Sequence, residues 1–209
     1  MTKGDSARHF VATWPKNRYL CGMTHDQLLF RPAAEADLGR IMEIIRAAQA
    51  RMRARGSSQW QNGYPAAADI LRDIERGYGH LLAEAETGLT VAYGAVLFEG
   101  EPAYEAIEGR WLTSGPYVMV HRLAVAEERK AGRYRRTACI PSRQGVARRF
   151  MQRVEALALT RGIGSFRVDT NFDNAGMLAL LAEAGFVRCG EIRYGAEHRE
   201  AFEKVLRRQ

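Results

Sequence analysis

Residues 142–150, SRQGVARRF, combine a glycine, a small residue and three arginines in a pattern that could hold an anion. Gly145 lets a ligand approach the backbone without a Cβ in the way, and Ala147 keeps the next position small. If a helix begins here, its first amides lack intrahelical acceptors and its dipole is positive, which favours phosphate. The stretch therefore indicates a phosphate-binding turn; the alternative is the start of a basic surface helix.

The positive charge of the chain is concentrated around this turn. The formal net charge is +7, and the segment 129–153 carries nine basic residues and no acidic one. The rest of the chain is therefore slightly acidic. Such a confined patch suits a compact polyanion better than a long duplex, so nucleic acid is the weakest of the partners that the charge suggests.

Length and composition indicate a single domain without a membrane segment. The 209 residues suit one α/β domain. No apolar run approaches the roughly 20 residues that span a bilayer, and charges interrupt the N-terminus where a secretory signal needs an apolar core. The three cysteines lack a CxxC spacing, so we expect neither a disulfide framework nor a metal site. We expect a cytoplasmic protein.

Hydrophobic periodicity predicts strands that alternate with helices. Expected strands are 27–32, 80–86, 90–98, 117–125, 165–170 and a C-terminal hairpin of 186–194 and 200–206. Expected helices begin at Asp37 as a cap, near residue 67, at Gly145 and after Asn174 as a cap. This order places the phosphate-binding turn at the start of a long helix in an α/β domain.

Four segments are similar, in order, to the motifs of one superfamily. They are LLFRPAAEADLGRIMEII at 28–45, HRLAV at 121–125, SRQGVA at 142–147 and DTNFDNAGMLALLAEAGFVRCG at 169–190. The chain thereby resembles the GNAT superfamily of acyl-coenzyme A dependent N-acetyltransferases. The resemblance implies an α/β (α+β) fold over 27–209, with helices flanking a mixed central sheet whose fourth and fifth strands splay apart. Residues 1–26 are then an N-terminal extension, which we expect to be flexible.

The resemblance also implies acetyl-CoA as the co-substrate and places its binding residues. The pantetheine arm would lie along the strand residues Leu123, Ala124 and Val125 as an added strand. Asn174 would face the pantetheine or stabilise its turn. The diphosphate would rest on the backbone amides of Arg143, Gln144, Gly145, Val146, Ala147 and Arg148.

The chain departs from the superfamily pattern in two places. The loop 127–142 is longer than usual and strongly basic, and its motif position is Ser142 instead of Gln or Arg. The superfamily often has a tyrosine seven residues after the helix asparagine, where its hydroxyl can protonate the departing thiolate; this chain has Leu181. Tyr194 is the weak candidate for that general acid, with another residue or water as alternatives.

Acyl transfer also needs a group that removes a proton from the acceptor amine. His121 is the candidate base, because an imidazole titrates in the useful range and the strand alternation places it on one face with Leu123. The alternative is a structural histidine at a strand edge. Trp60 and Tyr64 are the candidate acceptor-binding residues, and we expect less of Tyr104, Trp111 and Tyr117 in that role.

These residues together predict an N-acetyltransferase. It would move an acetyl group to a primary amine of a small molecule or peptide by direct transfer in a ternary complex. The rival reading is a non-catalytic acyl-coenzyme A sensor with a degenerate active site. The resemblance adds the expectation of a homodimer through the C-terminal strands, and we expect neither a metal ion nor a membrane as partner.

Overall fold

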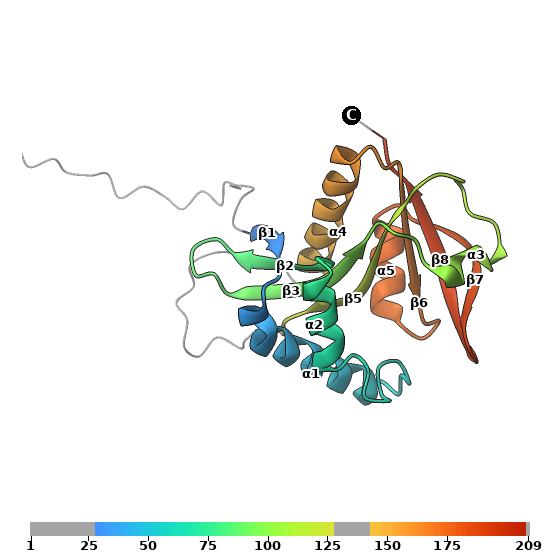
Figure 1. Cartoon of the computed structure of the whole chain (residues 1–209). Coiled ribbons are helices and arrows are strands. Elements are labelled where there is room, and N and C mark those ends of the chain that lie inside the picture. The colour runs from blue at the N-terminus through green and yellow to red at the C-terminus, as the bar shows by residue number, and fades with distance from the viewer. Residues whose placement is uncertain (1–27, 128–142, 208–209) are drawn as a thin grey trace, which may run out of the picture.

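A computed structural model describes residues 28–127 and 143–207 of the chain, which form one sheet with helices on both faces (Figure 1). The expected N-terminal extension and most of the basic loop 127–142 lie outside these residues. The sheet has eight strands in the order β1-β2-β3-β5-β6-β8-β7-β4. The strands are β1 Leu28–Pro32, β2 Gly79–Glu84, β3 Thr90–Leu97, β4 Glu108–Gly109, β5 Val118–Val125, β6 Ser165–Thr170, β7 Val187–Tyr194 and β8 Glu197–Val205.

Neighbouring residues of the strands pack against different helices. The helices are α1 Leu38–Ala54, preceded by the 3-10 turn Glu35–Asp37, and α2 Ala67–Glu75, α3 Pro102–Glu105, α4 Arg143–Thr160 and α5 Ala175–Glu183. Leu81 packs with the apolar faces of α1 and α2. Leu82, the next residue of β2, packs with Phe150 of α4 in the larger core. This period of two is the reason that both faces of the sheet are covered.

Strands β5 and β6 separate soon after they begin. They are parallel neighbours, yet they pair only at Val118 with Phe166 and at Met119 with Arg167. Beyond these two pairs, the facing edges of β5 and β6 are not paired with each other. The mixed sheet with two splayed central strands confirms the fold predicted from the sequence.

A bulge in β5 reverses its alternation between His121 and Ala124. His121 pairs with Ala95 and Ala124 pairs with Tyr93, so two residues of β5 oppose Gly94 alone. Arg122, the first of the two, has a φ of 58°. Leu123 consequently packs on the α4 side with Val120, whereas His121 lies near carboxylates of the other face. The expectation that His121 and Leu123 share a face is therefore wrong, because strict alternation ignores the extra residue.

Asp37 and Asn174 are the N-cap residues of α1 and α5 as predicted, but the two side chains behave differently. Asn174 does cap α5, since its side-chain oxygen accepts a hydrogen bond from the Met177 amide at 3.3 Å. Asp37 does not cap α1 with its side chain. Its carboxylate instead accepts from the Ala34 amide at 2.9 Å and pairs with Arg31. An arginine six residues upstream thus competes for the carboxylate that the sequence pattern assigns to the helix.

The close approach of α4 to the bulge leads to a stability prediction at Gly94. A Cβ added there would lie 2.8 Å from Cζ of the buried Phe150 ring. We expect Gly94→Ala to lower the free energy of unfolding by about 1–3 kcal/mol, because the core cannot take an extra methyl group without shifting this ring. Urea unfolding measures the change.

The matched control for this prediction is Gly39→Ala in α1, where an added Cβ meets no atom within 4 Å. We expect no loss of stability in the control variant. Equal stability of the two variants would contradict the packing argument.

Candidate functional site

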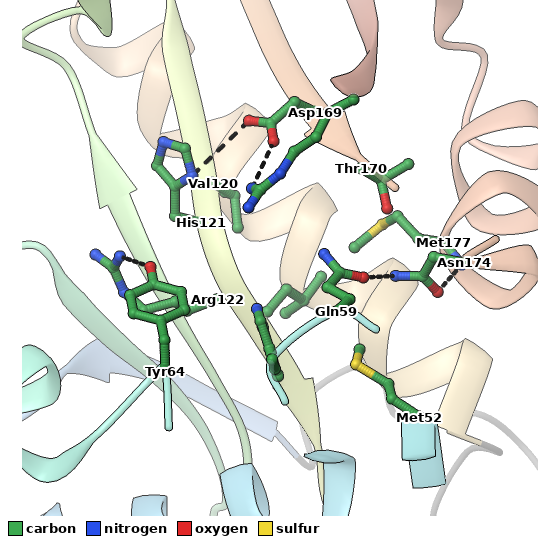
Figure 2. A pocket seen from close by; sticks show the side chains of 13 residues that line it. Met52, Gln59, Tyr64, Val120, His121, Arg122, Asp169, Thr170, Asn174 and Met177 are labelled. Carbon is green, nitrogen blue, oxygen red and sulfur yellow. Dashed lines mark hydrogen bonds and ion pairs between the residues drawn. The ribbon is translucent and has the colours of Figure 1, made fainter. Parts of the chain in front are cut away.

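Two adjoining hollows lie where β5 and β6 separate. A small pocket is lined by β5, the end of β6, the start of α5 and the loop between α1 and α2 (Figure 2). A wider cleft of about 530 Å³ continues from it along α2 and the β7–β8 hairpin. Several residues line both hollows, among them Trp60, Tyr64, His121, Arg122 and Arg199. The structure thus brings the candidate base and both candidate acceptor-binding residues to one place.

His121 lies between two carboxylates at the junction of the hollows. Its Nε2 is 3.6 Å from Glu101 and its Nδ1 is 3.9 Å from Asp169. Both distances exceed that of a hydrogen bond, and Nε2 is buried without a hydrogen-bond partner among residues 28–127 and 143–207. A buried polar atom without a partner is costly to the fold, so a ligand that completes it would be bound favourably.

Burial sets the protonation of His121. It lowers the pKa of the imidazole, and the nearby carboxylates Asp169 and Glu101 oppose this effect only in part. The neutral ring is therefore the stable form at neutral pH. A neutral imidazole can accept a proton from a bound ammonium group, which is what the predicted general base requires.

Asp169 is the hub of this site, and the sequence analysis missed it. Its side chain is 1% exposed. It accepts a hydrogen bond from the Tyr104 hydroxyl at 2.8 Å and forms an ion pair with Arg199 at 3.1 Å. The Tyr194 hydroxyl lies 3.5 Å from the same carboxylate. The available signal was a carboxylate next to the end of a predicted strand that runs beside β5.

Tyr194 lines the wider cleft and stays protonated there. Burial, and then the negative charge of Asp169, raise the pKa of its hydroxyl. A neutral hydroxyl can donate a proton, and its place in the cleft brings it near the candidate base. Its role as the general acid remains a prediction.

A buried ion pair holds the wall of the cleft. Arg122 donates from Nε to Asp73 at 2.7 Å and from a terminal nitrogen to the Tyr64 hydroxyl. Tyr93 donates to the same carboxylate at 2.7 Å. The Tyr64 ring is thereby held beside the guanidinium of Arg122 (Figure 2). Sequence reasoning missed both residues, because Arg122 stands in the motif HRLAV without an assigned role and Asp73 stands in no motif.

Three aromatic residues proposed for the acceptor pocket belong elsewhere. Tyr104 is buried in a small core, and neither Trp111 nor Tyr117 is among the residues that line the two hollows. The guanidinium of Arg167 lies over both of these rings, at 4.3 and 4.1 Å from the centroids. Less was expected of these three residues in the acceptor pocket, and the structure agrees, because their rings pack on one another and on Arg167 instead of facing the cleft.

The β5 residues assigned to the pantetheine arm have unequal access to the splayed edge. Leu123 lines the small pocket. Ala124 is buried against α1, and the carbonyl of Val125 accepts a hydrogen bond from Arg51 at 3.0 Å. Across the gap, Oγ1 of Thr170, the last residue of β6, is buried and has no hydrogen-bond partner in the described part of the chain. The gap therefore offers polar atoms from β6 as well as from β5.

Asn174 ties the small pocket to the loop between α1 and α2. Besides capping α5, it donates from its side-chain amide to Gln59 at 3.1 Å (Figure 2). Leu181, which stands at the usual tyrosine position, is fully buried in the larger core. That position therefore serves packing, and it does not face the pocket.

The predicted phosphate turn falls in the first turns of α4. The helix begins at Arg143, so Gly145 is in its first turn. Arg148 is further along, and its guanidinium forms an ion pair with Glu183 of α5 at 3.1 Å. The preceding loop and the side chains of Arg143 and Gln144 lie outside the described part of the chain.

Residues 28–127 and 143–207 form neither a membrane span nor a metal-binding cluster. No helix there is long and apolar enough to cross a membrane. In the same ranges, no three His, Cys, Asp or Glu side chains gather closely enough to hold a metal ion.

Solved structures of known proteins give the site its context. No protein-family model matches the chain, and no curated protein matches it in sequence. A GNAT-family acetyltransferase from Streptococcus agalactiae is 30% identical, with a TM-score of 0.71 over 87% of this chain and 96% of that one.

Two more distant structures share the fold. A GNAT-family acetyltransferase from Listeria monocytogenes is 18% identical, with a TM-score of 0.61 over 86% of this chain and 95% of that one. The yncA protein from Salmonella typhimurium, whose structure contains its cofactor acetyl-CoA, is 16% identical, with a TM-score of 0.56 over 88% and 96% of the two chains. Because the Streptococcus relative matches over nearly its whole length, and because β5 and β6 splay as the motifs predict, the chain belongs to the GNAT family of acetyltransferases.

Proposed function

We propose that the protein transfers an acetyl group from acetyl-CoA to a primary amine of a small molecule or peptide, by direct transfer in a ternary complex. The observation that carries this proposal is the buried imidazole of His121, whose Nε2 has no hydrogen-bond partner among the described residues where the wider cleft meets the splayed strands. A proton acceptor at this position would lie between the two proposed substrates.

The residues around the splay fit acetyl-CoA. The unpaired strand edges suit an extended arm rich in amides, and Thr170 Oγ1 is a buried polar atom of the small pocket that a bound amide would complete. The first-turn amides of α4 suit the diphosphate, which favours residues 143–145 over Arg148 within the predicted set. When bound, acetyl-CoA supplies an activated acetyl thioester.

The residues of the chain then have separate tasks in the transfer. His121 accepts a proton from the acceptor ammonium, so that the amine becomes a nucleophile. The Leu123 amide is the proposed hydrogen-bond donor for the carbonyl oxygen. Tyr194 donates a proton to the sulfur that leaves. The aromatic wall of Trp60 and Tyr64 positions the amine, and positioning supplies much of the rate.

The rival function is a sensor that binds acyl-coenzyme A without catalysis. The burial of Leu181 at the usual tyrosine position favours it. The two functions differ in one product, because only the enzyme releases coenzyme A thiol when an amine is added.

Calorimetry with acetyl-CoA, followed by thiol release across amines and peptides, tests both functions. We expect binding and amine-dependent release, and we expect Gly145→Val to abolish the binding because a branched side chain would meet the diphosphate. Gly39→Val, in the first turn of α1, is the matched control and should bind normally. Binding without release for every acceptor would establish the sensor, and normal binding by Gly145→Val would refute the phosphate turn.

A further inference from the structure

The charged residues of the wider cleft neutralise one another with two exceptions. Arg72 lies 3.5 Å from Asp69, Arg122 is bonded to Asp73, and Arg199 lies 3.1 Å from Glu197. The remaining charged residues that line the cleft, apart from His121, are Glu101 and Arg76. Neither is paired with an oppositely charged Lys, Arg, Asp or Glu side chain in the described part of the chain. The cleft thus presents one uncompensated negative and one uncompensated positive charge.

Glu101 is held in place next to the candidate base. Its Oε1 accepts a hydrogen bond from the Ala103 amide at 3.3 Å, and its own backbone amide donates a hydrogen bond to the Tyr117 hydroxyl oxygen at 2.9 Å. Its Oε2 lies 3.6 Å from Nε2 of His121. An ammonium group that binds to this carboxylate is therefore placed within reach of the imidazole.

Arg76 is an exposed residue that immediately follows α2. Arg72 lies one turn before it, so both guanidinium groups project from one side of the helix. The positive charge of Arg76 reaches the Tyr78 hydroxyl and acts to lower its pKa, although the hydrogen bond that Tyr78 donates to Glu99 prevails and the pKa is raised. Guanidinium groups bind carboxylates and phosphates through paired hydrogen bonds.

We infer that the acceptor is a small amphoteric amine, such as an amino acid, which carries both an ammonium group and an anionic group. The inference rests on the proposed function and adds the class of its acceptor. The ammonium binds at Glu101 beside His121, and the anion binds at Arg76. The cleft volume of about 530 Å³ falls in the range of about 300–1,000 Å³ in which proteins bind small molecules.

Matched pairs of acceptors test this inference directly. Thiol release from acetyl-CoA is measured with L-amino acids and with their carboxamides, which keep the amine and lack the anion. We expect a higher kcat/KM for the acid than for its amide. Arg76→Glu should lower this acid-to-amide ratio by about tenfold, since it replaces an attraction by a repulsion, and Arg76→Gln should lower it less.

The ratio is insensitive to a partial loss of folded protein, because both acceptors are measured on the same preparation. Arg46→Glu is the control, since Arg46 is exposed on α1 outside the cleft, and its ratio should equal that of the unmodified protein. A preference for the amides, or an unchanged ratio in Arg76→Glu, would overturn the inference while the acetyltransferase activity stands. If no amine of any kind led to thiol release, the proposed function itself would be refuted.

Discussion

Replacing His121 with glutamine is expected to lower kcat by about 10²–10⁴-fold, which is the usual contribution of a general base. The amide cannot accept the proton of the acceptor ammonium, while its size and polarity keep it compatible with the site. Coenzyme binding should be retained, because the imidazole lies on the face of β5 opposite to Leu123. Thiol release and calorimetry on the same preparation measure the two quantities.

The pH dependence of kcat/KM identifies the group that is lost. Burial lowers the pKa of His121, and the neutral form is the active one, so the ring stays active to a lower pH than an exposed histidine would. The acid limb of the profile should therefore lie below about pH 6.5, and His121→Gln should abolish it. Asp169 acts to raise this pKa, so Asp169→Asn should move the limb to still lower pH.

A second buried histidine supplies the control. Burial also lowers the pKa of His80, yet this residue stacks on Phe30 and does not line either hollow. His80→Gln should leave the acid limb in place. A limb that survives in His121→Gln, or that disappears in His80→Gln, would remove His121 as the base.

The fold was predictable because its elements follow simple periodicities. Hydrophobic periodicity predicts the strand 117–125 and the helix near Gly145, and both exist in the structure. The resemblance then supplied the splay of β5 and β6, which no periodicity indicates. Local patterns and motif order together were enough for the architecture.

The site was less predictable because it depends on one irregularity and on contacts between distant residues. The bulge at Arg122 changes which face each later residue of β5 occupies, and nothing in the letters HRLAV signals it. Asp73 and Asp169 are buried carboxylates, and the arginines that pair with them lie 49 and 30 residues away in the sequence. Glu101 lies in a loop whose position depends on the whole β3–β5 connection. Residue type or motif position singled out the predicted residues that do line the hollows, which are Trp60, Tyr64, His121, Leu123, Asn174 and Tyr194.

Arg122 carries the largest expected effect on stability. Its partner Asp73 has a side chain that is 6% exposed. Removing the guanidinium leaves that carboxylate buried, with the Tyr93 hydroxyl as its one remaining side-chain partner among the described residues. We expect Arg122→Ala to lower the free energy of unfolding by about 3–5 kcal/mol, the cost of breaking a buried ion pair from one side. Urea unfolding measures it. Arg188→Ala, which breaks only exposed pairs, should change stability by less than about 1 kcal/mol.

The backbone of Arg122 allows the ion pair and the bulge to be separated. At a φ of 58° an alanine is strained, whereas glycine adopts this conformation freely, so Arg122→Gly should be less destabilising than Arg122→Ala by about 0.5–1 kcal/mol after the entropy of glycine is counted. The double variant with Asp73→Ala should recover part of the loss, because no unpaired charge then remains buried. If alanine and glycine were equivalent, the left-handed bulge would be refuted. If the double variant lost as much stability as the two single variants together, the stabilising role of the ion pair would also be refuted. The stability of this wall would then have to come from packing alone.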